Sequence, residues 1–225
     1  MARHDRAALG WQLLPLVLVF VVVCTVAKLT TVPALAGSSA EAFVQQNVDK
    51  GITILKDKGI GGGDRREAVR KLLTGLLDTK KIGLFALGAA RDKAPQPVLD
   101  AYVSAFNDFM IASYVSRLDG YGGQSLNVTG SVERAPGDFI VTAVLVDPSA
   151  PTDPDPVKIM FRVLDENGTL ALVDASIAGV WLGLAQRDDF GGYLSQHQES
   201  IPALTAHLQA MTASFNAQTG STRAP

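Results

Sequence analysis

The spacing of apolar residues changes twice along this chain of 225 residues. Up to about residue 118 the apolar side chains recur every three or four positions, which predicts amphipathic helices. Between residues 125 and 177 they form short runs separated by turn residues, which predicts strands. From residue 180 onward the helical spacing returns. The chain therefore cannot be all helix or all strand, and we expect a single α+β domain.

Four helices are expected ahead of the strands. Ser38 and Asp64 each stand three residues before a glutamate, which is the spacing of a capping box at the start of a helix. Asp78 begins a third, shorter helix. Pro97, a residue type favoured in the first helical turn, begins a long fourth helix that ends near Leu118.

Turn signals divide the next region into four strands, at 125–133, 139–146, 157–164 and 170–177. One link contains Asn167-Gly168, the strongest short-range signal for a β-hairpin. Sequential strands with short links pair as neighbours, so we expect a four-stranded antiparallel sheet. The second strand is almost wholly apolar, which predicts burial on both faces. Helices at 180–195 and 201–215 follow, and helices from both termini should pack against the sheet.

The first 36 residues have the organisation of a secretory signal. Arg3 and Arg6 precede an uncharged run at 13–27, whose 15 residues fall short of the roughly 20 that a membrane span needs. The sequence Ala34-Leu35-Ala36 then matches the small-residue pattern of a cleavage site. We therefore expect export and cleavage after Ala36.

Two other interpretations of this segment stay open. Without cleavage, the run up to Leu29 would anchor the chain in the inner membrane. Lipidation at Cys24 is disfavoured because Val23 occupies a position that needs a small residue. With cleavage, residues 37–217 would form the folded domain, and the polar residues 218–225 a disordered tail.

Composition and motifs argue against several classes of function. The formal net charge is −2, from 20 basic and 22 acidic residues, so nothing indicates a nucleic-acid partner. The single cysteine, Cys24, excludes a disulfide framework and a cysteine-based zinc site. Beyond residue 36 the only histidines are His197 and His207, and no Gly-x-Ser-x-Gly motif occurs. We therefore expect no catalytic residues, no metal site and no cofactor.

The wide apolar faces of these helices and strands allow two interpretations. Such faces either form a filled core or line a cavity for an apolar ligand. Their periodicity does not distinguish the two.

Four blocks of residues occur in an order typical of one protein family. They are Leu72-Leu73 to Leu77-Asp78 with Ile82, Phe85 and Leu87-Gly88; Tyr102, Phe106, Tyr114, Leu118, Tyr121 and Gly123; Val141 to Pro148; and Asp174, Ile177, Gly179-Val180, Leu182, residues 186–190, Leu204, His207 and Leu208. On these blocks the chain, from Phe43 to about Met211, resembles the MlaC family, the periplasmic phospholipid-binding component of the Mla lipid transport system. Ala89-Ala90-Arg91 departs from the family, which often has an aromatic residue there.

The resemblance implies an α+β domain whose sheet and helices enclose an apolar pocket for lipid acyl chains. The family carries glycerophospholipid between an outer-membrane lipoprotein–porin complex and an inner-membrane ABC transporter with its substrate-binding ring, and so supports outer-membrane lipid asymmetry. We accordingly expect a periplasmic lipid carrier and not an enzyme. The alternatives are a hopanoid-associated carrier, by resemblance to a neighbouring branch, and a non-lipid-binding periplasmic adaptor anchored to the inner membrane.

The candidate site residues follow from this expectation. Lipid contacts are expected from the apolar residues Leu76, Leu84, Phe85, Phe106, Phe109, Met110, Leu145, Ile159, Phe161, Val163 and Trp181. Arg187 and Asp188 are assigned to docking a partner or to positioning at the pocket mouth. A pocket is needed because a buried CH₂ contributes about 0.8 kcal/mol, so one 16-carbon chain left in water costs on the order of 12 kcal/mol.

Overall fold

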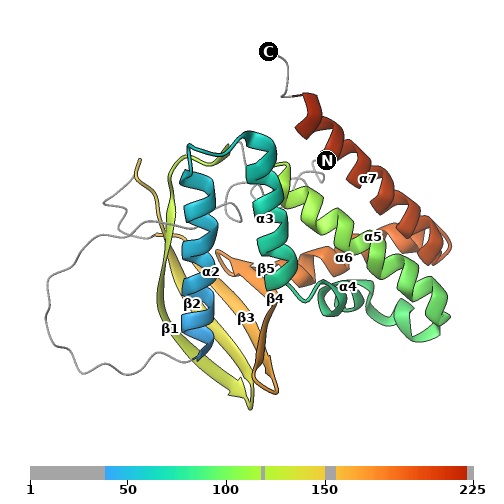
Figure 1. Cartoon of the computed structure of the whole chain (residues 1–225). Coiled ribbons are helices and arrows are strands. Elements are labelled where there is room, and N and C mark those ends of the chain that lie inside the picture. The colour runs from blue at the N-terminus through green and yellow to red at the C-terminus, as the bar shows by residue number, and fades with distance from the viewer. Residues whose placement is uncertain (1–38, 118–119, 150–155, 222–225) are drawn as a thin grey trace, which may run out of the picture.

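A computed structural model describes residues 39–117, 120–149 and 156–221 of the chain. It shows an antiparallel sheet with one helix across it and a group of helices beside it (Figure 1). The helices are α2 (Ser39–Lys56), α3 (Gly62–Leu76), α4 (Thr79–Leu87), the 3-10 helix η1 (Gly88–Lys93), α5 (Gln96–Val115), α6 (Leu182–Gln196) and α7 (Ile201–Ser221). The strands are β1 (Ser125–Ala135), β2 (Asp138–Val146), β3 (Lys158–Glu166), β4 (Thr169–Ile177) and β5 (Val180–Trp181). The expected α+β class is confirmed.

Some predictions from the sequence fall on residues that the structure does not describe. The secretory signal at 1–36, the capping residue Ser38 and the last four residues, 222–225, all lie outside the described residues. Residues 218–221, predicted as part of a disordered tail, continue helix α7.

The sheet has five strands, not the four that were predicted. Their order is β1-β2-β3-β4-β5, and each is antiparallel to its neighbours. The additional strand pairs Val180 with Ile177. It forms because Ala178 and Gly179 both adopt positive φ (49° and 85°), the conformation of a tight two-residue hairpin turn. The helix predicted from residue 180 therefore begins at Leu182 instead.

Strand β2 is buried on one face only, so the prediction of burial on both faces is wrong. Val141 and Ala143 are fully buried, whereas Ile140, Thr142 and Val144 alternate with them and are half-buried. The buried face belongs to a core shared with α2. The other helices contact the sheet mainly through β4 and β5. Among the described residues, the opposite face of β2 is therefore only half-buried, whereas its apolar sequence predicted full burial.

Of the three predicted helix-start signals on described residues, those at Asp78 and Pro97 are confirmed and the one at Asp64 is wrong. Asp78 caps α4, and its carboxylate accepts a hydrogen bond from the backbone N–H of Lys81 at 2.9 Å. Pro97 lies in the first turn of α5, which begins one residue earlier. Helix α3 starts at Gly62 rather than at Asp64, and no side chain forms a hydrogen bond at its cap.

The apolar residues divide into two cores. In one, the apolar stripe of α2 packs on β1, β2 and β3, where Val141 and Ile159 are buried. In the other, α3 to α7 pack around residues such as Phe106. Leu145 and Phe161 contact both cores. The space between the two cores is therefore bounded by the sheet, α2 and the helical group.

Helix α3 connects the two cores. It packs against α2 on one side and α5 on the other (Figure 1). At its end Leu77 forms an isolated bridge with Leu172 of β4, and the Asp78 backbone N–H donates to the Leu172 carbonyl at 3.0 Å. These backbone contacts fix the helical group relative to the sheet.

Candidate functional site

A cavity of about 160 Å³ lies where the two cores meet. Its walls come from every α-helix of the described chain and from β1, β3 and β4, and most of its lining is apolar. One water molecule needs roughly 10–15 Å³. The cavity therefore has room for more than one water molecule, and its mostly apolar lining is of the kind that apolar ligands contact.

Five of the predicted lipid contacts line this cavity. Phe106, Phe109 and Met110 recur with helical spacing and present one face of α5. Leu76 of α3 and Phe161 of β3 contribute to other walls. Residues that are up to 85 positions apart in the sequence (76 and 161) are thus brought to one site by the junction of the cores.

The other six predicted contacts do not line the cavity. They are Leu84, Phe85, Leu145, Ile159, Val163 and Trp181. Ile159 and Val163 are fully buried in the core beneath α2, and the other four are half-buried. An apolar pattern marks all of these positions as inward-facing without showing which of them face the cavity.

An aromatic cluster holds the α5 wall in place. The ring of Phe190 on α6 packs edge-on against Phe106 at 6.0 Å and against Tyr102 at 6.3 Å between ring centres. The fully buried Tyr102 hydroxyl donates to the Gly83 carbonyl at 2.9 Å. A Cβ at Gly83 would lie 2.7 Å from Cδ1 of Phe106. Glycine at this position therefore permits the close approach of α4 to α5.

Two hydrogen-bond donors near the end of α5 also line the cavity, Tyr114 and Arg117. The Arg117 guanidinium donates to the Ser113 carbonyl, and its Cζ lies 5.6 Å from the centre of the Phe215 ring. Burial lowers the pKa of Arg117 and raises the pKa of Tyr114 to about 12, so the phenol is neutral at pH 7 and the guanidinium is charged. Within the described residues, Arg117 has no carboxylate partner and the Tyr114 hydroxyl has no acceptor.

Asp174 and Gln186 supply further polar groups to the cavity. The Asp174 carboxylate accepts hydrogen bonds from the backbone N–H groups of Ala175 (2.8 Å) and Gly183 (2.9 Å), so it caps the first turn of α6. Burial raises the pKa of Asp174 in spite of these hydrogen bonds. The buried amide nitrogen of Gln186 has no acceptor among the described residues. Gln186 thus adds a donor without a described acceptor to the donors of Tyr114 and Arg117 at this cavity.

Several cavity residues were not among the predicted contacts. Tyr114, Asp174, Leu182 and Gln186 belong to the blocks that carry the family resemblance, and that signal could have identified them. Arg117 had no such signal, because a basic residue ahead of a glycine-rich turn is ordinarily solvated.

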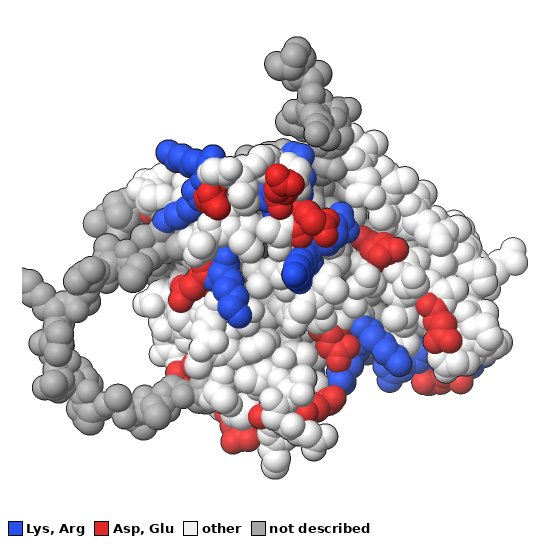
Figure 2. All heavy atoms as spheres, viewed as in Figure 1, with Lys and Arg blue, Asp and Glu red and all other residues white. Residues whose placement is uncertain are grey.

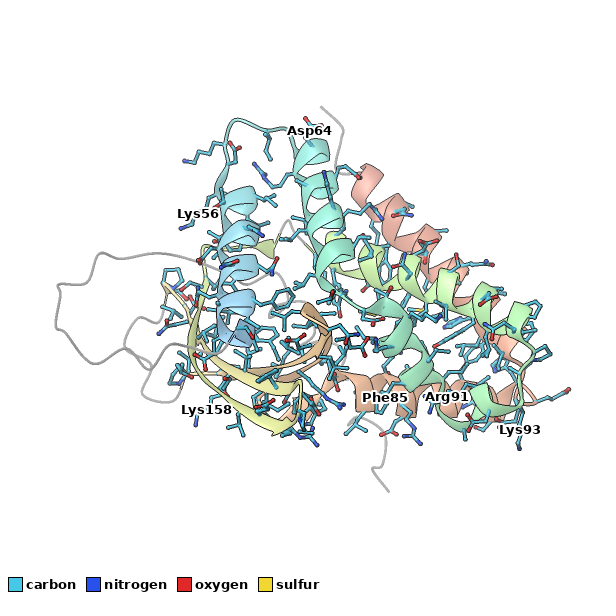
Figure 3. The ribbon with its side chains drawn as sticks, turned by 60° about the horizontal axis from the view of Figure 1, so that its bottom comes forward. Lys56, Asp64, Phe85, Arg91, Lys93 and Lys158 are labelled. Carbon is cyan, nitrogen blue, oxygen red and sulfur yellow. The ribbon has the colours of Figure 1, made fainter. Side chains whose placement is uncertain are left out.

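Arg187 and Asp188 lie outside the cavity. Both are exposed on α6, and neither lines its walls. The Arg187 guanidinium carbon is 5.8 Å from the centre of the Phe85 ring. Phe85 and Arg91 lie along the edge formed by α4 and η1, away from Asp64 at the start of α3 (Figure 3). This pair therefore contributes nothing to the cavity walls.

Charge is unevenly distributed over the face seen in Figure 2. Basic and acidic side chains are interspersed over α2 and α3, whereas the upper right, where α7 lies, is nearly free of them (Figures 1 and 2). Helix α7 contains no Asp, Glu, Lys or Arg in its 21 residues. In the part of the chain that the structure describes, no helix has the length and apolar character needed to cross a membrane.

A family model described as MlaC protein matches residues 45–210. The chain belongs to the MlaC family. The matched range includes every residue that lines the cavity except Val44 and Phe215. No curated protein sequence matches this MlaC-family chain.

A solved structure shares the fold of this MlaC-family chain. It is the phospholipid-binding protein from Ralstonia solanacearum in complex with a phospholipid, with a TM-score of 0.65 and 20% sequence identity. The match covers 79% of this chain and 98% of the other. At this identity the likeness establishes the fold, and the MlaC family itself indicates a binding or transport protein rather than an enzyme.

Proposed function

We propose that this chain is a periplasmic phospholipid carrier that moves lipid between the inner-membrane and outer-membrane Mla complexes. The observation that carries the proposal is the apolar cavity at the junction of the two cores. Membership of the MlaC family supports it, as does the phospholipid bound to the Ralstonia protein of the same fold.

A protein of this kind solves a problem of solubility. Each 16-carbon chain exposed to water costs on the order of 12 kcal/mol, so a free diacyl lipid does not cross an aqueous compartment at a useful rate. Walls built from Phe106, Phe109 and Leu76 replace the membrane interior with another apolar environment. Loading and release then need little net free energy, and the direction of transfer is set by the partners.

Native mass spectrometry of the protein, purified from the periplasm without detergent, tests lipid binding directly. We expect one mass increment, released on activation as a diacyl glycerophospholipid. A released hopanoid would favour the alternative polycyclic ligand. A protein that stays bare, even after incubation with phospholipid vesicles, would contradict the proposal and favour an adaptor with a filled core.

A matched pair of substitutions locates the ligand. Leu76→Asp places a carboxylate in the cavity wall, whereas Leu184→Asp places it on the surface of α6, where the leucine is 49% exposed. A carboxylate without a partner among acyl chains costs several kcal/mol, so the first variant should lose about 100-fold or more in lipid affinity. The second should retain its lipid. Circular dichroism establishes that both variants are folded.

Docking to the partner complexes is assigned to the surface around Arg187 and Asp188. Arg187→Glu should weaken binding to the inner-membrane transporter while leaving the bound lipid in place, because Arg187 does not line the cavity. The control is Arg134→Glu on β1, which makes the same charge change at another exposed site. Equal effects of the two variants would refute the assignment.

Location in the periplasm depends on the proposed signal at residues 1–36. The mass of the protein recovered from the periplasmic fraction should correspond to a chain that begins at Gly37. A full-length product in the inner membrane would favour the anchored form.

A further inference from the structure

The polar groups left without partners at the cavity indicate what the ligand itself supplies. Arg117, Tyr114 and Gln186 all present donors there. Within the described residues none of them has an acceptor other than the Ser113 carbonyl that Arg117 contacts. A ligand that suits such a site carries several acceptor oxygens. Fatty acyl chains carry none, so the groups point to the polar part of the ligand.

We propose that Arg117 and Tyr114 form a subsite for the phosphate of the bound phospholipid. The inference rests on the proposed function and adds a polar recognition element to it. Tyr114 lies in the last turn of α5 and Arg117 two residues after its end, where the Arg117 backbone N–H donates to the Tyr114 carbonyl at 3.1 Å. Both side chains line the same cavity.

Arg117 differs from two other cations of the domain, Arg162 and Lys81, in what it pairs with. Arg162 forms a forked ion pair with Asp138, at 3.0 and 3.1 Å, and Lys81 binds Asp78 at 2.7 Å. Arg117 is half-buried and has no carboxylate within the described chain. A partly desolvated cation is unfavourable without an anion, and a bound anion would remove that cost.

A phosphodiester fits the free donors. The guanidinium has five N–H groups, and its planar fork matches two oxygens of a phosphate. The neutral Tyr114 hydroxyl can donate to the same group. A bound phosphate is attracted by the Arg117 cation and repelled by the carboxylate of Asp174, which lines the same cavity.

The test compares ligands with and without a phosphate-containing head group. The lipid-free protein is titrated calorimetrically with dioctanoyl phosphatidylglycerol, with dioctanoylglycerol and with inorganic phosphate. The variants are Arg117→Gln, Arg117→Lys and Tyr114→Phe, and the control is Arg134→Gln, an exposed cation on β1 that does not line the cavity. Hydrogen bonds to a charged group correspond to about 10- to 100-fold in affinity, so the wild type should prefer the phospholipid over the diacylglycerol by that factor.

Each outcome bears on the inference. Loss of the preference in Arg117→Gln, partial retention in Arg117→Lys and full retention in Arg134→Gln would support it. Equal affinity of the wild type for the two lipids would overturn the subsite and leave lipid binding intact. Failure to bind either lipid would overturn the proposed function instead. Binding of inorganic phosphate alone with the same dependence on Arg117 would show a free-anion site and refute the lipid assignment. If Arg117→Gln does not fold, Tyr114→Phe provides the test. Loss of its preference for the phospholipid over the diacylglycerol supports the subsite, and full retention overturns it.

Discussion

Replacing two glycines by alanine tests how closely α4 packs against the cavity wall. Gly75 and Gly83 both lie inside helices, so each substitution gains about 1 kcal/mol of helix propensity. At Gly75 an added Cβ has no atom within 4 Å. At Gly83 the same atom would lie 2.7 Å from Cδ1 and 3.1 Å from Cγ of Phe106. One substitution should therefore stabilise the fold and the other should destabilise it.

The size of the difference follows from the surroundings of Phe106. Its side chain is 1% exposed, and its ring is held by Tyr102, Phe109 and Phe190, so it cannot move aside freely. Overpacking of this kind costs about 1–3 kcal/mol, and a contact below 3 Å belongs in the upper half of that range. After the gain in helix propensity, Gly83→Ala should lower the free energy of unfolding by about 1–2 kcal/mol. Gly75→Ala should raise it by about 1 kcal/mol.

Urea unfolding of the lipid-free variants, followed by circular dichroism, measures both effects. With an unchanged slope m, the midpoint should move down for Gly83→Ala and up for Gly75→Ala. The displaced Phe106 ring should also occupy part of the cavity and weaken lipid binding in the first variant. If both substitutions raise the midpoint equally, the close approach of α4 and α5 does not exist, and the reasoning about this wall is refuted.

Three further predictions concern the groups around the cavity. Phe190→Ala removes a 5% exposed ring from the aromatic cluster and should cost about 3–5 kcal/mol in thermal unfolding; a loss below about 1 kcal/mol would contradict the packing. Tyr102→Phe removes the hydrogen bond to Gly83 and should cost about 0.5–1.5 kcal/mol in urea, with no loss expected if that bond is absent. Asp174 has a pKa raised by burial above its ordinary value of 3.8, so the folded state binds more protons than the unfolded state as pH rises through that window, and its stability falls. The stability of Asp174→Asn relative to the wild type should therefore increase from pH 4 to pH 7 in urea titrations, and a constant or decreasing difference would exclude this ionisation.

Local patterns were sufficient for much of the fold. The change in apolar spacing correctly predicted helices, then strands, then helices, and Asn167-Gly168 correctly marked the hairpin between β3 and β4. Asp78 correctly predicted the start of α4. These features depend on residues close together in the chain, so the sequence carries them directly.

Features that depend on distant contacts were missed. Strand β5 has two residues, too few for any periodic pattern, and it exists because the turn at Ala178-Gly179 returns the chain to β4. Strand β2 is as apolar as a doubly buried strand, yet helices cover one face of it. In both cases a contact with another element determines the structure: β5 pairs with β4, and α2 covers one face of β2.

Phe161 and Val163 show most clearly that an apolar pattern does not identify which residues face the cavity. They lie two positions apart on β3, and both were predicted to contact lipid. Phe161 lines the cavity, whereas Val163 is fully buried beneath α2.

By itself, then, the sequence determined the class of fold and the apolar inward faces, because the period of apolar residues reports which side of an element avoids water. Only the tertiary structure decided where those faces fail to meet. The position of α2, α3 and α5 relative to the sheet left a cavity and placed Arg117 at its wall. A cavity is the space between elements, and no local pattern specifies that space.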